Sequence, residues 1–290
     1  MIVIGVVGIS LSSIFVRYSS APSSVTAAFR LIWTVLLMSP VVLGKRSIRG
    51  ELMSLNRKAK GLCILSGVFL AFHFWLWFES LKLTSVASST AIVCTEVLWV
   101  SMGYCLFMKG RLGKKAIISI AVAFTGSIII AFSDSMTGGV HAKGDLLALL
   151  SAVCVALYTL IGRSIRKTVS TTAYTYVVYV SCAGVLILIS LMQKQNLLLF
   201  GKDAIIVGFL LALFSTILGH SIFSWCLKYF SPSFVSASKL TEPIVAAIFA
   251  AILFSEYPGI LQIAGGLMIV LSVLYYSRIE SENHKRQDRQ

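Results

Sequence analysis

Three ionisable residues lie deep within long apolar stretches of the sequence. Glu96 stands in the run 86–108, and Lys239 and Glu242 stand in the run 234–255. An ionisable group in such surroundings is costly, so each is a candidate functional residue. Lys239 and Glu242 are one helical turn apart and are expected to share a helix face, either as a working site or as a fixed structural pair. Glu96 has no cation within a turn on its own helix and is the stronger candidate.

Aromatic residues and histidines form a second set of candidates. His73 and Trp77 are four residues apart, so they share one face of the helix predicted over 61–80. An aromatic wall with one titratable group suits cationic or aromatic organic molecules, and aromatic side chains that face lipid are the alternative. Tyr158, His220 and Trp225 stand in other apolar runs and are further candidates for the same cavity. His220 is equally well interpreted as a packed core residue.

Other polar residues inside the apolar runs have a structural interpretation. Arg30 is expected to face lipid headgroups or to pair with a helix terminus. The serines at 12–13, 88–89 and 236–238 permit close helix packing or offer hydroxyl groups to a ligand, and the sequence does not separate these roles.

The composition indicates the elements that must hold these residues. Of 290 residues, 57% are hydrophobic and 12% are charged, whereas a soluble domain is about half apolar and about a quarter charged. Helices of about 20 apolar residues cross a bilayer, and such runs are too long for barrel strands. The predicted fold is an all-α polytopic membrane protein with ten transmembrane helices, at 2–16, 25–43, 61–80, 86–108, 115–133, 145–163, 172–192, 204–228, 234–255 and 259–277. The segment 44–60 is predicted to be a basic loop and the tail 278–290 to be disordered.

The net charge of +14 follows from an uneven distribution of Lys and Arg over alternate loops. Most of the 25 basic residues fall on the side that also holds both ends of the chain. The positive-inside rule therefore predicts cytoplasmic termini in a plasma or inner membrane, and contact of the basic loops with anionic lipid. Nucleic-acid binding is disfavoured because the charges are spread over many short loops. The six cysteines lack metal-ligand spacing, so neither a metal site nor a cofactor is expected.

The chain also matches itself at an offset of 146 residues. Leu81-Lys82 aligns with Leu227-Lys228, Thr95-Glu96 aligns with Thr241-Glu242, and Arg17 aligns with Arg163. The predicted repeats cover 1–133 and 144–277, followed by the cytoplasmic tail 278–290. Because each unit would hold five spans, the second copy must be inverted in the membrane, which is typical of secondary transporters. A duplication kept only for packing is the alternative.

These motifs resemble the EamA family of the drug/metabolite transporter superfamily over essentially the whole chain. The resemblance implies a ten-helix inverted-repeat carrier of small metabolites, often an exporter, with a pathway between spans 1, 3, 4, 6, 8 and 9. Val97 and Lys109-Gly110-Arg111 depart from the family pattern in the first half, where a proline and an acidic residue are expected. The residues that carry the resemblance are Ser88-Ser89-Thr90-Ala91, Thr95-Glu96, Ser236-Ala237-Ser238, Thr241-Glu242-Pro243, Phe254-Ser255-Glu256, Ala28-Phe29-Arg30 and Gly144–Leu149.

The leading functional hypothesis is a secondary transporter of a small organic metabolite, such as an amino acid or a related compound, that works by alternating access. Coupling to protons or solute exchange, import or export, and a monomer or a homodimer all stay open. An intramembrane lipid-modifying enzyme is disfavoured because no clustered nucleophile, metal motif or phosphate-binding loop is present. A channel or a non-transporting structural subunit is the remaining alternative.

Overall fold

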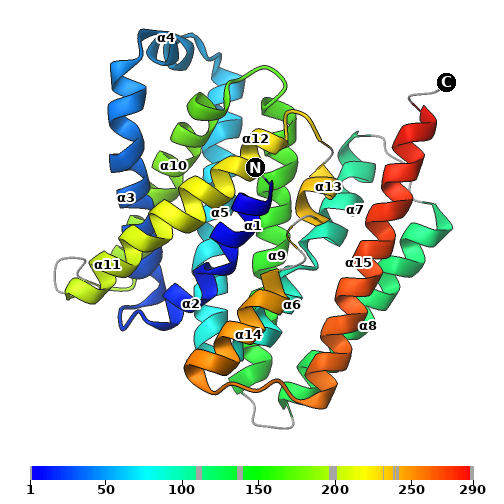
Figure 1. Ribbon diagram of the computed structural model, residues 1–290. Coiled ribbons are helices and arrows are strands. Elements are labelled where there is room, and N and C mark those ends of the chain that lie inside the picture. The colour runs from blue at the N-terminus through cyan, green and yellow to red at the C-terminus, as the bar shows by residue number, and fades with distance from the viewer. Residues whose placement is uncertain are drawn as a thin grey trace.

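The computed structural model is built of helices and describes residues 2–108, 113–135, 140–195, 201–230, 232–237, 239 and 242–287 (Figure 1). Within these residues, six helical stretches of 22 to 27 residues are long and apolar enough to cross a membrane, and four shorter apolar helices accompany them. The prediction of an all-helical membrane protein is therefore confirmed. The helices are α1 (Ile2–Ser10), α2 (Ser12–Arg17), α3 (Ser23–Gly44), α4 (Arg46–Ser54), α5 (Arg57–Leu83), α6 (Val86–Val93), α7 (Glu96–Met108), α8 (Lys114–Ser135), α9 (Val140–Ile165), α10 (Thr171–Met192), α11 (Lys202–Leu210), the π-helix η1 (Leu211–His220), α12 (Ser221–Cys226), α13 (Pro232–Ala237), α14 (Glu242–Phe254) and α15 (Ile260–Gln287).

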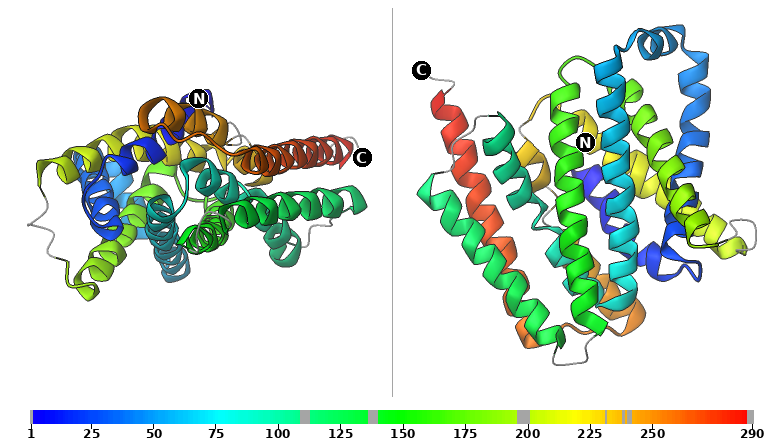
Figure 2. Two further views of the ribbon diagram at one scale, coloured as in Figure 1. Left: turned by 90° about the horizontal axis from the view of Figure 1, so that it is seen from below. Right: turned by 180° about the vertical axis from the view of Figure 1, so that it is seen from behind.

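The centre of the molecule is built around α5, which packs against both α9 and α10 (Figures 1 and 2). Phe74 and Phe78 of α5 and Tyr179 of α10 are fully buried there. Polar side chains join these helices as well: the Ser66 and Tyr174 hydroxyl groups hydrogen bond at 2.8 Å. Leucine and isoleucine side chains on the outer helices are exposed, as expected for a surface that lipid covers.

Two of the predicted continuous spans are broken. The span 86–108 divides into α6 and α7 at Cys94 and Thr95, where the Thr95 hydroxyl donates to the Ile92 carbonyl at 2.7 Å. The span 234–255 divides into α13 and α14, and Pro243 follows the first residue of α14, where the missing N–H costs no helical hydrogen bond. In Figure 1, α6 and α7 run upward, whereas α13 and α14 run downward. The two broken helices are therefore antiparallel.

The structure corrects three other predictions. The segment 44–60 is not simply a loop, because it contains α4, whose residues are all at least partly exposed, as in a helix that lies at a membrane interface. The tail is helical rather than disordered as far as Gln287, since no glycine or proline interrupts α15 after Gly266. The span 2–16 is divided at Leu11 into α1 and α2. The span 204–228, in contrast, is one helical stretch, Lys202–Cys226, whose middle part is the π-helix η1.

At one edge of the molecule, α8 and α15 lie side by side (Figures 1 and 2). Their contact depends on two glycines that face each other. A Cβ atom on Gly126 would lie 2.7 Å from the Gly265 carbonyl oxygen, and one on Gly265 would lie 2.6 Å from the Gly126 carbonyl oxygen. Neither backbone oxygen can move without moving its helix, so only glycine fits at these two positions.

We predict that Gly126→Val or Gly265→Val lowers the thermal midpoint of the purified protein by about 5 °C, because overpacking a close contact costs about 1–3 kcal/mol. The matched control is Gly266→Ala, because a Cβ atom there meets no atom within 4 Å. Its midpoint should stay unchanged or rise. Equal effects of Gly265→Val and Gly266→Ala would contradict this packing.

Candidate functional site

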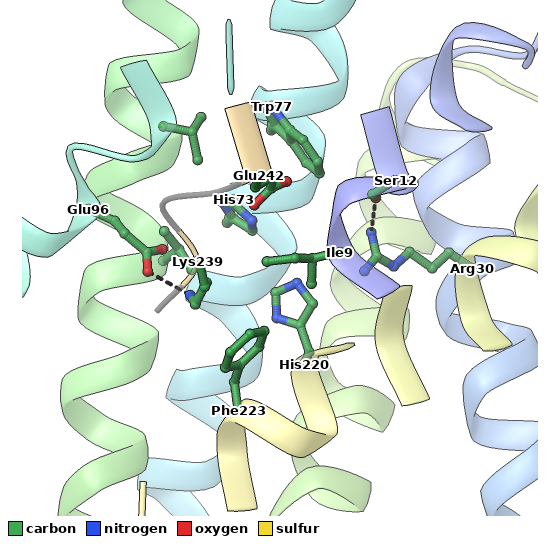
Figure 3. Close-up of a pocket in the computed structure, with 12 residues that line it drawn as sticks. Ile9, Ser12, Arg30, His73, Trp77, Glu96, His220, Phe223, Lys239 and Glu242 are labelled. Carbon is green, nitrogen blue, oxygen red and sulfur yellow. Dashed lines mark hydrogen bonds and ion pairs between the residues drawn. The ribbon is translucent and has the colours of Figure 1, made fainter. Parts of the chain in front are cut away.

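A cavity lies between the two helix breaks (Figure 3). Six of the eight predicted site residues line it: His73, Trp77, Glu96, His220, Lys239 and Glu242. They come from α5, α7, η1, the turn between α13 and α14, and α14, so residues far apart in sequence meet here. The remaining lining residues are Ile9, Ser12, Arg30, Val93, Val155 and Phe223.

An ion pair joins the two breaks. The Lys239 Nζ atom lies 2.6 Å from the Glu96 Oε1 atom, and the side chains are 12% and 6% exposed. Glu96 is the first residue of α7, where the helix dipole favours a carboxylate. Lys239 lies in the turn that follows α13 (Figure 3).

The predicted pairing of Lys239 with Glu242 is wrong. It assumed one continuous helix, but α13 ends at Ala237, Lys239 stands in a turn, and its side chain bonds to Glu96 instead. Glu242 begins α14 in the same way as Glu96 begins α7. Among the residues that the structure describes, no ion pair includes Glu242.

An aromatic wall faces the ion pair. The rings of His73 and Trp77 stack with centroids 5.9 Å apart, and the His220 ring lies 6.2 Å from His73. The Ser151 hydroxyl donates to the His73 carbonyl at 3.0 Å, so its oxygen accepts from His73 Nδ1 at 2.8 Å. This assignment places the ring proton on Nδ1 and leaves Nε2 as a hydrogen-bond acceptor. The predicted shared face of His73 and Trp77 is present.

The other two predicted residues do not line the cavity. Tyr158 is buried behind it, where its hydroxyl group bonds to the Ser224 hydroxyl at 2.7 Å and its ring lies 6.3 Å from His220. Trp225 is 38% exposed and packs against Tyr229, with ring centroids 4.8 Å apart. Tyr158 therefore supports the wall, and Trp225 faces away from it.

Arg30 is the charged lining residue that the sequence interpretation missed. It was expected at a headgroup or helix terminus, but its side chain is completely buried and its guanidinium carbon lies 4.0 Å from the Phe74 ring centroid. Its Nε donates to the Thr216 hydroxyl at 2.7 Å, and its Nη1 donates to the Ser12 hydroxyl at 3.2 Å. The signal that identified Glu96, an ionisable group inside an apolar run, applies equally to Arg30.

A second ion pair, between Arg17 and Glu256, joins α2 to the segment that connects α14 and α15. Arg17 also donates to the Leu81 carbonyl at the end of α5 at 3.0 Å, and the Glu256 carboxylate accepts from the Val86 N–H at 3.1 Å. Arg163 makes the corresponding bond on α9, to the Leu227 carbonyl at 2.7 Å. These contacts fasten the ends of several helices together outside the cavity.

The sequence profile of the EamA-like transporter family matches residues 1–132 and again residues 142–278. The chain belongs to the EamA-like transporter family. The resemblance drawn from the sequence motifs is thereby confirmed, and the protein is a multi-pass membrane transporter of the EamA type.

Named relatives agree with this assignment. The "Uncharacterized transporter YyaM" of Bacillus subtilis (strain 168) is 28% identical, over 96% of this chain and 92% of that protein. The "Uncharacterized transporter YxxF" of the same strain is 22% identical, over 93% of this chain and 84% of that protein. An "Uncharacterized transporter" of Archaeoglobus fulgidus is 24% identical over 70% of this chain and 71% of its own. A solved structure titled "Crystal structure of protein" matches with a TM-score of 0.69 over 96% of this chain and 95% of that chain, and at 13% identity the likeness shows the fold alone.

We predict that Glu96→Gln or Lys239→Met alone destabilises the protein by about 3–5 kcal/mol, because each change leaves one buried charge without its partner. The double variant, which removes both charges, should be more stable than either single variant. Chemical denaturation of the purified protein measures the difference. Single effects that add in the double variant would contradict direct coupling between the two side chains.

Proposed function

We propose that this EamA-type protein is a secondary transporter of a small organic metabolite, such as an amino acid or a related compound, and that it works by alternating access. The observation that carries the proposal is the Glu96–Lys239 ion pair, which spans two helix breaks and lines a cavity. Broken helices around a buried site are the arrangement that secondary transporters use for substrates and coupling ions.

We further propose that the fold consists of two inverted five-span repeats. The bounds of α6 and α7 recur in α13 and α14 at the offset of 146 residues: 86 corresponds to 232, 96 to 242 and 108 to 254. The antiparallel course of the two broken helices in Figure 1 supports inversion. The bonds from Arg17 to the Leu81 carbonyl and from Arg163 to the Leu227 carbonyl support it as well, because both partners are displaced by the same offset.

The orientation we propose places both termini in the cytoplasm, with the protein in the plasma or inner membrane. The basic helix α4 then lies at the cytoplasmic end, at the top of Figure 1. The C-terminal end of α2 and the segment after α14 lie toward the bottom of that view. The Arg17–Glu256 pair would therefore close the pathway at the extracytoplasmic end.

In this mechanism, the buried ion pair is the part that changes during transport. Separating Lys239 from Glu96 without new partners leaves two desolvated charges, so the pair resists opening. A substrate or a proton that contacts either group, or Glu242 beside them, lowers this penalty. The two halves can then rearrange around the occupied cavity.

We predict that Glu96→Gln, Lys239→Ala and Glu242→Gln each reduce metabolite flux in proteoliposomes by at least about tenfold, which corresponds to about 1.4 kcal/mol. The matched control is Glu79→Gln, which changes a carboxylate on α5 that does not line the cavity and should retain flux. Unchanged flux in both Glu96→Gln and Lys239→Ala would overturn the residue assignment.

We also predict that Arg17→Gln and Glu256→Gln open the extracytoplasmic end more often, because each removes one partner of the ion pair there. The reporter is a cysteine introduced at Ile9, on the cavity wall, in a chain whose six native cysteines are replaced. Its reaction with a membrane-impermeant thiol reagent added outside should accelerate several-fold in either variant. Exchanging the two charges should restore slow labelling. Equal rates in all four proteins would exclude this closure.

A further inference from the structure

Arg30 is a buried cation without a carboxylate partner in the described part of the chain. Its side chain is fully buried, and the two ion pairs found among these residues are Arg17–Glu256 and Lys239–Glu96. A desolvated charge inside the membrane is costly unless something compensates it. The Phe74 ring and two hydroxyl groups compensate it in part, and the Glu242 carboxylate lines the same cavity without forming an ion pair with it.

The hydrogen bonds of Arg30 leave one end of its guanidinium group unused. Nε and Nη1 donate to Thr216 and Ser12, whereas the buried Nη2 atom has no hydrogen-bond partner. Figure 3 shows that this end of the side chain points toward Ile9 and His220, which line the cavity. Nη2 and its neighbour Nη1 form the fork that can hold two oxygen atoms of a carboxylate.

The protein holds Arg30 in this geometry before any ligand arrives. The guanidinium group lies on the Phe74 ring, and the Thr216 hydroxyl that accepts from Nε donates in turn to the Leu211 carbonyl at 3.2 Å. Thr216 and Leu211 both belong to η1, and π-helical segments are frequent at functional sites. The donor fork is thus fixed from the side opposite the cavity.

A second unsatisfied donor lines the same cavity. The buried Trp77 Nε1 atom has no hydrogen-bond partner among the described residues. Buried polar groups are nearly always satisfied in folded proteins, so these two N–H donors are available to a ligand in the cavity that accepts hydrogen bonds. A ligand with one negative charge is favoured over a dianion, because Glu96 and Glu242 also line the cavity and would repel a second negative charge.

From these observations we infer that Arg30 binds the carboxylate of a singly charged organic acid, and that this residue selects the substrate class. The inference rests on the proposed transport function, because it assigns the role of one residue in that cavity. The carboxylate occupies the Nη1–Nη2 fork. The remainder of the molecule lies along the wall of His73, Trp77 and His220.

The test uses the full chain in proteoliposomes loaded with an unlabelled soluble metabolite extract. The probe is the same extract in ¹³C-labelled form, added outside, and mass spectrometry identifies the compounds that accumulate. Wild-type protein should accumulate monocarboxylates, with or without an amino group, and Arg30→Gln should reduce this accumulation by at least about tenfold. Arg30→Lys, which keeps the charge but not the fork, should fall between them.

Three results separate the possibilities. Accumulation of compounds that carry no acidic group, or of phosphomonoesters in preference to monocarboxylates, would overturn the inference while leaving transport intact. Equal accumulation of acids by wild type and Arg30→Gln would overturn it too. Failure of the wild type to accumulate any compound would instead contradict the proposed function.

Two further variants keep the test decisive if Arg30→Gln does not fold. Thr216→Val removes the acceptor that orients Nε, and it should raise the KM for an accumulated acid several-fold with little change in maximal rate.

The methyl ester of that acid should compete far less well than the acid in wild type, and this preference should shrink in Thr216→Val. Arg166→Lys is the matched control, because Arg166 is buried outside the cavity and donates to the Ser224 carbonyl. It should keep the full preference, and equal preferences in Thr216→Val and wild type would overturn the inference.

Discussion

A charge inside a membrane protein must find a partner, and in this chain that requirement connects two helix breaks that are far apart in sequence. Glu96 and Lys239 are separated by 143 residues, yet their side chains meet at 2.6 Å. Neither stands within a continuous helix, since Glu96 begins α7 and Lys239 stands in the turn before α14. The ion pair and the interrupted helices are therefore one structural feature.

The remaining packing holds this feature in place and surrounds it with an apolar wall. The helices α5 and α9 supply the rigid support, because His73 Nδ1 bonds to the Ser151 hydroxyl at 2.8 Å and to the Ser151 carbonyl at 3.3 Å, which fixes the imidazole against the neighbouring helix. On the other side, Thr216 of η1 and Ser12 of α2 accept hydrogen bonds from Arg30 of α3. His73 and Arg30, which face the cavity, are thus positioned in part by Ser151 and Thr216, which do not line it, and this keeps their remaining donors and acceptors available to a ligand.

The sequence predicted the parts of this structure that depend on local physics. Long apolar runs specify membrane helices, and the four-residue spacing of His73 and Trp77 placed them on one face of α5. The break at Cys94 and Thr95 was not predictable in this way, because no glycine or proline marks it. Pro243 does mark the second break, but the interpretation of Lys239 and Glu242 as helical neighbours overlooked it. Arg30 was misplaced because its partners, Thr216 and Phe74, come from elements that a local reading does not bring together.

The central claim is that the cavity opens to one side of the membrane at a time, and solute counterflow in proteoliposomes tests it most directly. Vesicles are loaded with excess unlabelled metabolite, and entry of the labelled compound is followed over time. An alternating-access carrier predicts uptake that saturates with concentration and accelerates when the inside is preloaded. Uptake that rises linearly with concentration and does not respond to preloading would contradict the account.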